Sequence, residues 1–298
     1  MIDQEVKYRD LQTFAAEIGV APSNLVKVFE IETGFHNEIL RTTDHQKRQQ
    51  LYRDLYDTVL PLLISPNESA RARAIHTSLI KVFRRELVGK SVLDVGCGNG
   101  QFLALLDATI PHGGLCGLDT SYSDLHLEAF AQSVRFICQD ITSFTLDKTF
   151  DVVFSNQVFE HIAPADVTDH LNSVYSALFP GGTFIILTPN RLWGPSDVTR
   201  IVDNTYTGCV PAQGSHINER SYTELLPLLL SHGFEHVRTI LPFAVTVPLL
   251  GCVRVTPILN VCLERSSIMR RMTYLIKRHG KAIFKNPVVL VARRPARV

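Results

Sequence analysis

The sequence predicts an α/β fold in which a helical N-terminal region precedes a parallel sheet. Three observations support this class. Apolar residues recur at helical spacing within the first 90 residues, short β-branched strands alternate with helical segments from residue 91 to 240, and a final strand follows near the C-terminus. Such alternation implies right-handed crossovers and a sheet covered on both faces. The 298 residues are 45% hydrophobic and 20% charged, which excludes wholesale disorder, a collagen-like repeat and a coiled coil.

The first 90 residues are expected to be helical. Between residues 45 and 63, Leu51, Leu55, Val59 and Leu62 recur at helical spacing opposite a charged face. A proline and an asparagine then interrupt the pattern, which resumes over residues 70–88. We therefore expect two parts in the chain: a helical cap over residues 1–88 and a core over residues 89–298.

The core is expected to hold seven strands separated by helices. The strands are predicted at residues 91–95, 115–119, 134–140, 150–156, 183–190, 234–240 and 286–294. The helices are predicted at residues 101–107, 123–133, 164–178 and 223–233. Two further stretches, at about residues 191–222 and 242–284, are interpreted as insertions on the substrate side of the sheet.

The formal net charge is +1, but the charges are unevenly distributed. Residues 91–240 carry 6 Lys/Arg and 16 Asp/Glu, whereas residues 241–298 carry 11 and 1. The stretch 265–285 mixes basic and apolar residues, which is typical of a basic amphipathic helix. It can pack against the acidic core, or bind a membrane surface or a phosphorylated or lipid-linked substrate. Sparse aromatic residues there argue against nucleic acid.

The cysteines and the apolar runs bear on compartment and metal binding. The six cysteines are scattered, so we expect mostly buried thiols, a reducing compartment and no metal. The N-terminus is polar and does not resemble a secretory signal. The longest apolar run, residues 240–253, is shorter than the roughly 20 residues of a membrane-spanning helix. These features predict a cytoplasmic protein, with peripheral attachment to a membrane left open.

A glycine-rich loop follows the first predicted strand in the sequence VLDVGCGNGQF. Asp94 ends the strand, and Gly96, Gly98 and Gly100 follow before the next helix. Glycines allow a close approach of the backbone to a ligand, and a helix N-terminus presents free N–H groups to a carboxylate. Because an acidic strand end can hold an amine, the loop suits a ligand with both an amino and a carboxylate group.

This loop resembles the first motif of the class I S-adenosylmethionine-dependent methyltransferases, and the resemblance covers about residues 85–240 and the last strand. It implies a seven-stranded Rossmann-like sheet that binds S-adenosylmethionine and releases S-adenosylhomocysteine. The family pattern places Asp119 and Thr120 at the ribose, and Asp140 and Ile141 at the adenine. After the fourth strand, the sequence SNQVFEHI resembles the family's post-strand motif and places Asn156 and Gln157 near the methionine end. Each aspartate can alternatively be a cap or turn residue.

The groups that act on the methyl acceptor are expected next to this motif. Glu160 and His161 follow the cofactor loop directly, and His216 lies in GSHINE, which resembles a stretch of small-molecule tailoring methyltransferases. A histidine titrates near neutral pH and can serve as the base for a hydroxyl nucleophile. Each of the three can instead simply bond backbone groups.

Other residues are expected to cover the cofactor or line the acceptor pocket: Tyr52, Tyr56, Asn190, Arg191 and Trp193. The sequence thus predicts methylation of a small molecule, at oxygen before nitrogen or carbon. An RNA or protein methyltransferase and a non-catalytic cofactor-binding subunit stay open as alternatives. A nicotinamide dehydrogenase is disfavoured because the third glycine comes one residue too early for its motif.

Overall fold

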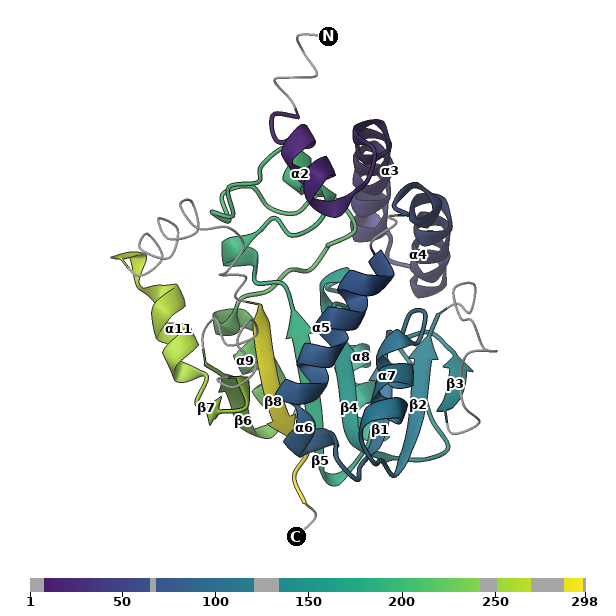
Figure 1. The fold of residues 1–298 in the computed structure, drawn as a ribbon, viewed down its shortest axis with the longest axis vertical. Coiled ribbons are helices and arrows are strands. Elements are labelled where there is room, and N and C mark those ends of the chain that lie inside the picture. Colours follow the sequence, from purple (N-terminus) through teal and green to yellow (C-terminus); the bar gives the residue numbers. More distant parts are fainter. Residues whose placement is uncertain (1–7, 65–67, 121–133, 242–250, 269–286, 297–298) are drawn as a thin grey trace.

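A computed structural model describes residues 8–64, 68–120, 134–241, 251–268 and 287–296. The chain forms a twisted sheet covered by helices on both faces, with a group of helices above one end (Figure 1). The strands are β1 Ser91–Val95, β2 Gly114–Asp119, β3 Val134–Cys138, β4 Phe150–Asn156, β5 Leu178–Thr188, β6 Glu235–Ile240, β7 Arg254–Val255 and β8 Val288–Arg293. The predicted helix at 123–133 and most of the basic stretch at 265–285 lie outside the described residues.

The sheet has the order β3-β2-β1-β4-β5-β8-β6-β7. The strands from β3 to β5 pair in parallel, as the alternating pattern predicts. The sheet has eight strands in the described residues, one more than expected, because the short β7 pairs with β6. The last strand, β8, runs antiparallel between β5 and β6, a direction that the sequence leaves open. A buried strand has the same apolar composition in either direction, so its sequence does not reveal its orientation.

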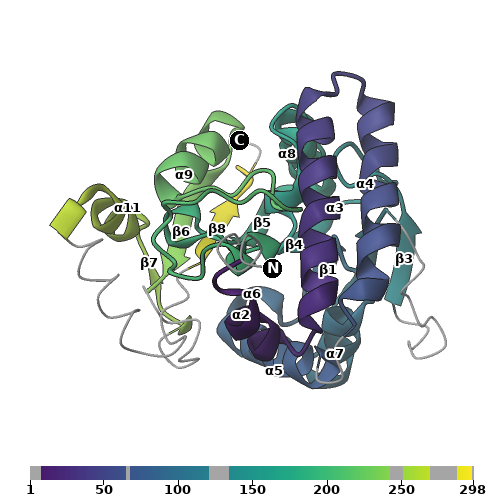
Figure 2. The ribbon, with the colours of Figure 1, turned by 90° about the horizontal axis from the view of Figure 1, so that it is seen from above.

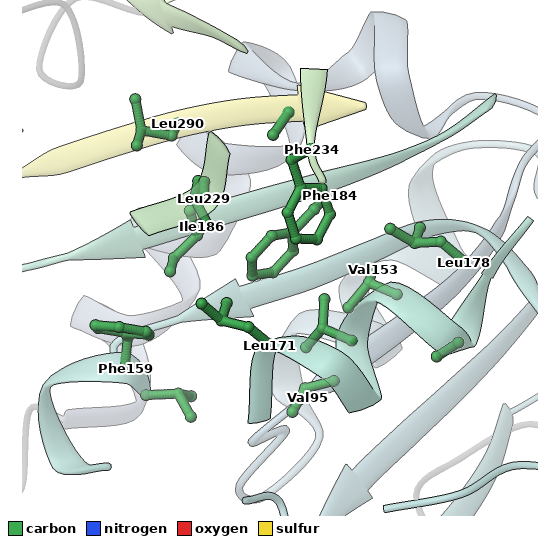
Figure 3. Close-up of a cluster of buried hydrophobic side chains, with 14 of the residues drawn as sticks. Val95, Val153, Phe159, Leu171, Leu178, Phe184, Ile186, Leu229, Phe234 and Leu290 are labelled. Atoms are coloured by element: carbon green, nitrogen blue, oxygen red, sulfur yellow. The ribbon is translucent and has the colours of Figure 1, made fainter. Parts of the chain in front are cut away.

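The core helices lie on the two faces of the sheet. They are α5 Glu68–Val82, α6 Arg84–Leu87, α7 Gln101–Thr109, α8 Val167–Ala177, α9 Tyr222–Ser231 and α11 Ile258–Arg265. One apolar cluster joins the sheet to α8 and α9, with Phe184 and Phe234 in contact at its centre (Figure 3). A second cluster joins the other face to α5, α6 and α7, where Phe102 stacks on Phe154. This burial on both faces explains why the strands are continuously apolar.

Of the region 1–88 that was expected to form the cap, α5 and α6 pack on the sheet instead. The remaining N-terminal cap consists of α2 Leu11–Ile18, α3 Pro22–Arg41, α4 His45–Val59 and the 3-10 turn η1 Leu60–Leu62. Helices α3 and α4 form an antiparallel pair above the carboxyl ends of the strands (Figure 2). Asp44 begins α4 by accepting a hydrogen bond from the backbone N–H of Lys47. The cap has its own apolar cluster, which includes Val198 and Ile201 of the segment after β5. Cap and segment therefore pack together over the end of the sheet where the site is expected.

The cysteines differ from expectation. Cys97 and Cys116 are buried, whereas Cys138, Cys209, Cys252 and Cys262 are exposed. The expectation of mostly buried thiols is therefore wrong. Among the described residues, no helix is both long and apolar enough to cross a membrane.

Candidate functional site

The glycine-rich loop joins β1 to α7 and adopts backbone conformations that only glycine enters readily. Gly96, Gly98 and Gly100 have φ angles of 73°, 51° and 74°. A Cβ atom at Gly96 would lie 2.3 Å from Cγ2 of Val158, so no side chain fits there. A Cβ at Gly98 would meet no atom within 4 Å, so this turn faces open space in which a ligand can approach the backbone.

Two carboxylates meet beneath this loop. Asp94 is only 4% exposed, and its burial together with the charge of Asp119 raises its pKa well above the ordinary value. Asp119 holds the loop: its Oδ2 accepts the N–H of Gly98 at 2.8 Å and its Oδ1 accepts the N–H of Thr120 at 2.7 Å. Two acidic groups held this close favour a cationic partner, as the amino group of S-adenosylmethionine would be.

Asp140, which follows β3, contacts a cap residue that the sequence did not point to, His45. Asp140 Oδ1 accepts the N–H and hydroxyl of Thr142, while its Oδ2 lies 2.8 Å from Nε2 of His45. His45 belongs to the cap and reaches Oδ1 of Asp166 through Nδ1, at 3.0 Å. The carboxylate expected at the adenine is thus already bonded on both oxygens. His45 had no sequence signal because it lies 95 residues from Asp140.

Arg48 completes this group by donating two hydrogen bonds to the buried carboxylate of Asp166. Burial tends to raise the pKa of Asp166, but the hydrogen bonds from Arg48 and His45 outweigh it, so its pKa is lowered. Burial tends to lower the pKa of His45, but the bonds to Asp166 and Asp140 outweigh it, so its pKa is raised. These ion pairs fasten α4 to the sheet. Ile141, also expected at the adenine, is half-buried beside them and accepts a hydrogen bond from Nδ1 of His170 through its carbonyl oxygen.

The turn after β4 brings the next predicted residues to the same edge. Asn156 ends β4, and Gln157 is exposed with a φ of 59°. The N–H of Gln157 bonds the carbonyl of Leu187, which fixes the turn to β5. Phe159 then anchors the 3-10 turn η3 Phe159–His161 at the margin of the apolar core (Figure 3). Glu160 and His161 are thereby fixed relative to the strand ends.

The structure brings together the three residues expected to act on the acceptor. Glu160, His161 and His216 can each offer one ligand atom, and these atoms all lie within 4.8 Å of one another. The rings of His161 and His216 meet edge to face, with centroids 4.7 Å apart. Tyr56 of α4 lies on the other side of His161, at 6.0 Å. A cap residue, a residue after β4 and a loop residue after β5 thus form one cluster.

Each member of the cluster is held by a specific contact. Nδ1 of His161 lies 3.1 Å from the carbonyl oxygen of Ser215, and Nδ1 of His216 lies 2.7 Å from Oε1 of Glu219. Oε2 of Glu160 accepts the hydroxyl proton of Thr188 at 3.0 Å. Oε1 of Glu160 is buried and has no hydrogen-bond partner among the described residues. Both rings are oriented through Nδ1, which leaves each Nε2 for another group.

The pKa values of the three clustered residues differ widely from one another. Burial lowers the pKa of His161 to about 3. Burial also tends to lower the pKa of His216, but the hydrogen bond to Glu219 and the charges of Asp197 and Glu160 outweigh it and raise the value to about 9. Burial raises the pKa of Glu160 to about 7. Acidic and basic groups with such divergent values side by side are typical of functional sites.

The loop that carries His216 is held by residues that sequence reasoning missed. Glu32 of α3 is 3% exposed and accepts the N–H of Ser215 at 2.7 Å. Asp197 accepts the N–H of Gly214 at 2.8 Å, and Nδ1 of His36 lies 2.8 Å from the carbonyl oxygen of Gly214. Burial and the charge of Asp197 raise the pKa of Glu32 to about 7. The sequence signal that could have pointed to these contacts is the presence of polar residues on the otherwise apolar face of α3.

The other residues that were expected to cover the cofactor or line the acceptor pocket are bonded to other parts of the fold or are buried. The hydroxyl of Tyr52 accepts the N–H of Ala163, so Tyr52 ties α4 to the core. Asn190 is buried and donates to Glu264 of α11, and Arg191 pairs with Glu224 of α9. Trp193 is buried in the 3-10 turn η4 Arg191–Trp193. The structure places Tyr56 beside the cluster, whereas Asn190 is bonded to α11 and Arg191 to α9.

Comparison with known proteins agrees with this geometry. The family model of a methyltransferase domain matches residues 46–239, more than half of the chain. A ubiquinone biosynthesis O-methyltransferase of Coxiella burnetii is 34% identical over 112 residues, which are 35% of this chain and 46% of that protein. A trans-aconitate 2-methyltransferase of Rhodopseudomonas palustris is 32% identical over 114 residues, 38% of this chain and 43% of that protein. The matches thus span less than half the length of either relative.

Among solved structures, the [4+2]-cyclase SpnF superimposes with a TM-score of 0.53 at 17% identity, over 84% of this chain and 97% of that one. At this identity, the likeness shows the fold alone. The family match includes the glycine loop, the aspartates at the strand ends and the Glu160–His161 turn, but not α2 and α3. The chain therefore belongs to the methyltransferase domain family.

Proposed function

We propose that this methyltransferase transfers the methyl group to a hydroxyl oxygen of a small-molecule acceptor, as a tailoring step in biosynthesis. The observation that carries the proposal is the convergence of Glu160, His161 and His216 within 4.8 Å at the turn after β4. A neutral amine attacks through its own lone pair, whereas a hydroxyl must lose a proton as it is methylated. A cluster of proton-accepting atoms next to the cofactor loop therefore favours an oxygen acceptor.

The surroundings of the cluster support a small acceptor. Helices α3 and α4 stand over this end of the sheet, and the loop 214–216 is fixed to α3 through Glu32 and His36. Glu160 is fully buried, while His161 and His216 are half-buried. Such recessed groups suit a compact molecule better than an RNA duplex or a protein surface. The names of the relatives from Coxiella burnetii and Rhodopseudomonas palustris, which refer to small molecules, agree with this proposal.

The reaction on these residues is a direct displacement. The acceptor oxygen forms a bond to the methyl carbon as the carbon–sulfur bond of the sulfonium breaks, and S-adenosylhomocysteine leaves. The hydroxyl proton is taken up at Glu160 or His161. His216, with its pKa raised to about 9, is already protonated at neutral pH and contributes its positive charge. The chain's main contribution is alignment, because the reacting atoms must be held about 3 Å apart and in line.

A turnover assay tests this proposal. The protein is incubated with methyl-labelled S-adenosylmethionine and a panel of phenols, hydroxy acids, carboxylic acids and amines, and the products are identified by mass. We expect methylation of a hydroxyl compound. In His161→Gln and His216→Gln, turnover should fall by about 10²–10⁴-fold, the usual contribution of acid–base groups.

His112→Gln is the matched control, because His112 bonds Asp107 at the far end of α7 and should keep full turnover. Affinity for S-adenosylhomocysteine should be unchanged in all three variants. Full turnover in both His161→Gln and His216→Gln would show that the assignment of these histidines is wrong. Methylation of amines alone would overturn the choice of oxygen.

A further inference from the structure

One polar atom in the cluster of Glu160, His161 and His216 has no partner among the described residues. Oε1 of Glu160 is fully buried and has no hydrogen-bond partner among the described residues. A buried carboxylate oxygen left in this state is costly, so it is normally paired with a donor or a cation. One ring nitrogen each of His161 and His216 lies within 4.8 Å of a carboxylate oxygen of Glu160, and both rings are oriented through Nδ1.

The orientation of the two rings is informative. A backbone carbonyl can only accept, so Nδ1 of His161 donates its proton to Ser215 and the lone pair is on Nε2. Nδ1 of His216 is bonded in the same way to the carboxylate of Glu219. A histidine that ligates a metal almost always donates its other N–H to a carboxylate or a carbonyl. Both outer contacts of this arrangement are present here.

The charges around the cluster are predominantly negative. Glu160, Glu219 and Glu32 are bonded to backbone amides, a threonine hydroxyl and His216. None of these bonds within the described residues comes from Lys or Arg. Among these carboxylates, only that of Glu219 is bonded to a basic side chain, His216. A cation at the cluster would therefore balance their negative charge.

We infer that Glu160, His161 and His216 form a binding site for one divalent transition-metal ion. Two imidazoles and one carboxylate favour Zn²⁺, Mn²⁺, Fe²⁺ or Co²⁺ over Mg²⁺ or Ca²⁺, which prefer oxygen ligands. Three atoms that lie no more than 4.8 Å apart have a central point no more than about 2.8 Å from each of them. Metal bonds of about 2.1 Å therefore require each donor to move inward by at most about 0.7 Å.

This inference deepens the proposed function. The three protein donors leave coordination positions open, and an acceptor oxygen can occupy one of them. A bound ion would occupy the lone pairs of His161 and His216 and displace the second proton of His216. Its charge would then replace these groups as the base, because it would lower the pKa of the acceptor hydroxyl so that the proton passes to solvent. Ion binding is measured with neither cofactor nor acceptor present. A failure to bind the ion can therefore be distinguished from a wrong choice of acceptor.

The test is titration of the full chain, freed of metal by a chelator, with Co²⁺ and with Zn²⁺. We expect one ion per chain by calorimetry and visible Co²⁺ absorption bands typical of nitrogen and oxygen ligands. The bands should be absent in His161→Gln and His216→Gln. Glu219→Gln, which alters only the contact behind His216, should weaken binding by about 10–100-fold.

Two controls keep the result clear. His112→Gln should bind the ion as the unchanged protein does, and S-adenosylhomocysteine binding should be retained in every variant, which shows that each is folded. The exposed cysteines are the competing site, and they would produce a sulfur-to-cobalt charge-transfer band in the near ultraviolet. That band alone, equal binding in the histidine variants, or no binding of either ion would overturn the inference.

Discussion

Asp94 shows at the scale of one residue how a site is prepared for a charged ligand. Its carboxyl group is buried beside Asp119, and no basic side chain is bonded to it in the described structure. Burial of a carboxylate next to another is unfavourable for folding alone, because both charges lose water and repel each other. Such a cost is expected at a functional site, where the ligand provides the missing partner.

Asp94→Asn should therefore weaken cofactor binding without lowering the stability of the fold. A hydrogen bond to a charged group contributes about 1.5–3 kcal/mol, so affinity for S-adenosylmethionine should fall by about 10–100-fold. The melting temperature without ligand should not fall, because the repulsion with Asp119 is removed. Calorimetric titration and thermal melting check the two effects. Asp147→Asn, which changes an exposed partner of Arg135, should alter neither; a drop in stability without loss of affinity in Asp94→Asn would refute this interpretation.

At the scale of elements, the cap and the segment after β5 act together on the histidine loop. Gly214 lies where α3 and the turn at Asp197 meet: a Cβ atom there would be 2.3 Å from Oε2 of Glu32 and 2.7 Å from Oδ2 of Asp197. Neither carboxylate can move freely, because each bonds a backbone N–H of the loop. The loop position of His216 thus depends on close contact between distant segments.

Gly214→Ala should displace this loop. We expect turnover to fall by at least about tenfold, because small misplacements of reacting groups are costly, while S-adenosylhomocysteine still binds. Gly34→Ala in α3 is the matched control: no atom lies within 4 Å of its Cβ, and the exchange should stabilise the helix by about 0.5–1 kcal/mol. Kinetics and chemical denaturation measure these effects. Equal turnover in the two variants would show that the loop does not position His216.

The contact of α4 with the sheet is expected to depend on pH through His45. Its pKa is raised in the folded protein, so its contribution to stability is complete below its unfolded pKa of about 6.5 and is lost as the pH rises through the folded value. His45→Gln should therefore lower the melting temperature at about pH 6, and much less at about pH 9. Melting curves of both proteins across this range check the prediction. A deficit that grew toward alkaline pH would contradict the sign.

The opposite sign applies to Asp166. Its pKa is lowered in the folded protein, so it stabilises the fold above its unfolded value of about 3.9 and loses that contribution as the pH falls through the folded value. Both Arg48 and His45 depend on this carboxylate. The contact of α4 with the sheet is therefore expected to weaken at acid pH, where Asp166 becomes protonated, and also at alkaline pH, where His45 loses its proton.

At the scale of the whole molecule, the cofactor should stabilise the folded chain. A ligand present at 100 times its dissociation constant stabilises the native state by about 2.7 kcal/mol. Addition of S-adenosylhomocysteine should raise the melting temperature in a concentration-dependent way, and NADH should leave it unchanged. Differential scanning calorimetry measures both. A rise with NADH alone would contradict the reading of the glycine loop.

The class of fold and the edge of the sheet that carries the site residues could be predicted from local sequence patterns alone. Strand and helix periods are local properties, and the glycine loop, Asp119, Asp140 and the turn at Asn156 each follow a strand directly. Because parallel strands end at one edge, locating the strands was sufficient to gather these residues. The described strand bounds agree with the predicted ones to within a few residues, except that β5 begins earlier.

Only the tertiary structure decided which distant residues meet at the site. His45, Glu32 and Asp197 carry no motif. The contacts of His45 with Asp140 and of Glu32 with Ser215 span 95 and 183 residues of chain, and the contact of Asp197 with Gly214 spans 17. The same holds for the distance between His161 and His216, for the direction of β8 and for the bonds that hold Asn190 and Arg191. Such facts depend on how helices and loops pack over the sheet. The periodicity and spacing of one chain record local structure and burial, but not which side chains face each other once the layers have closed.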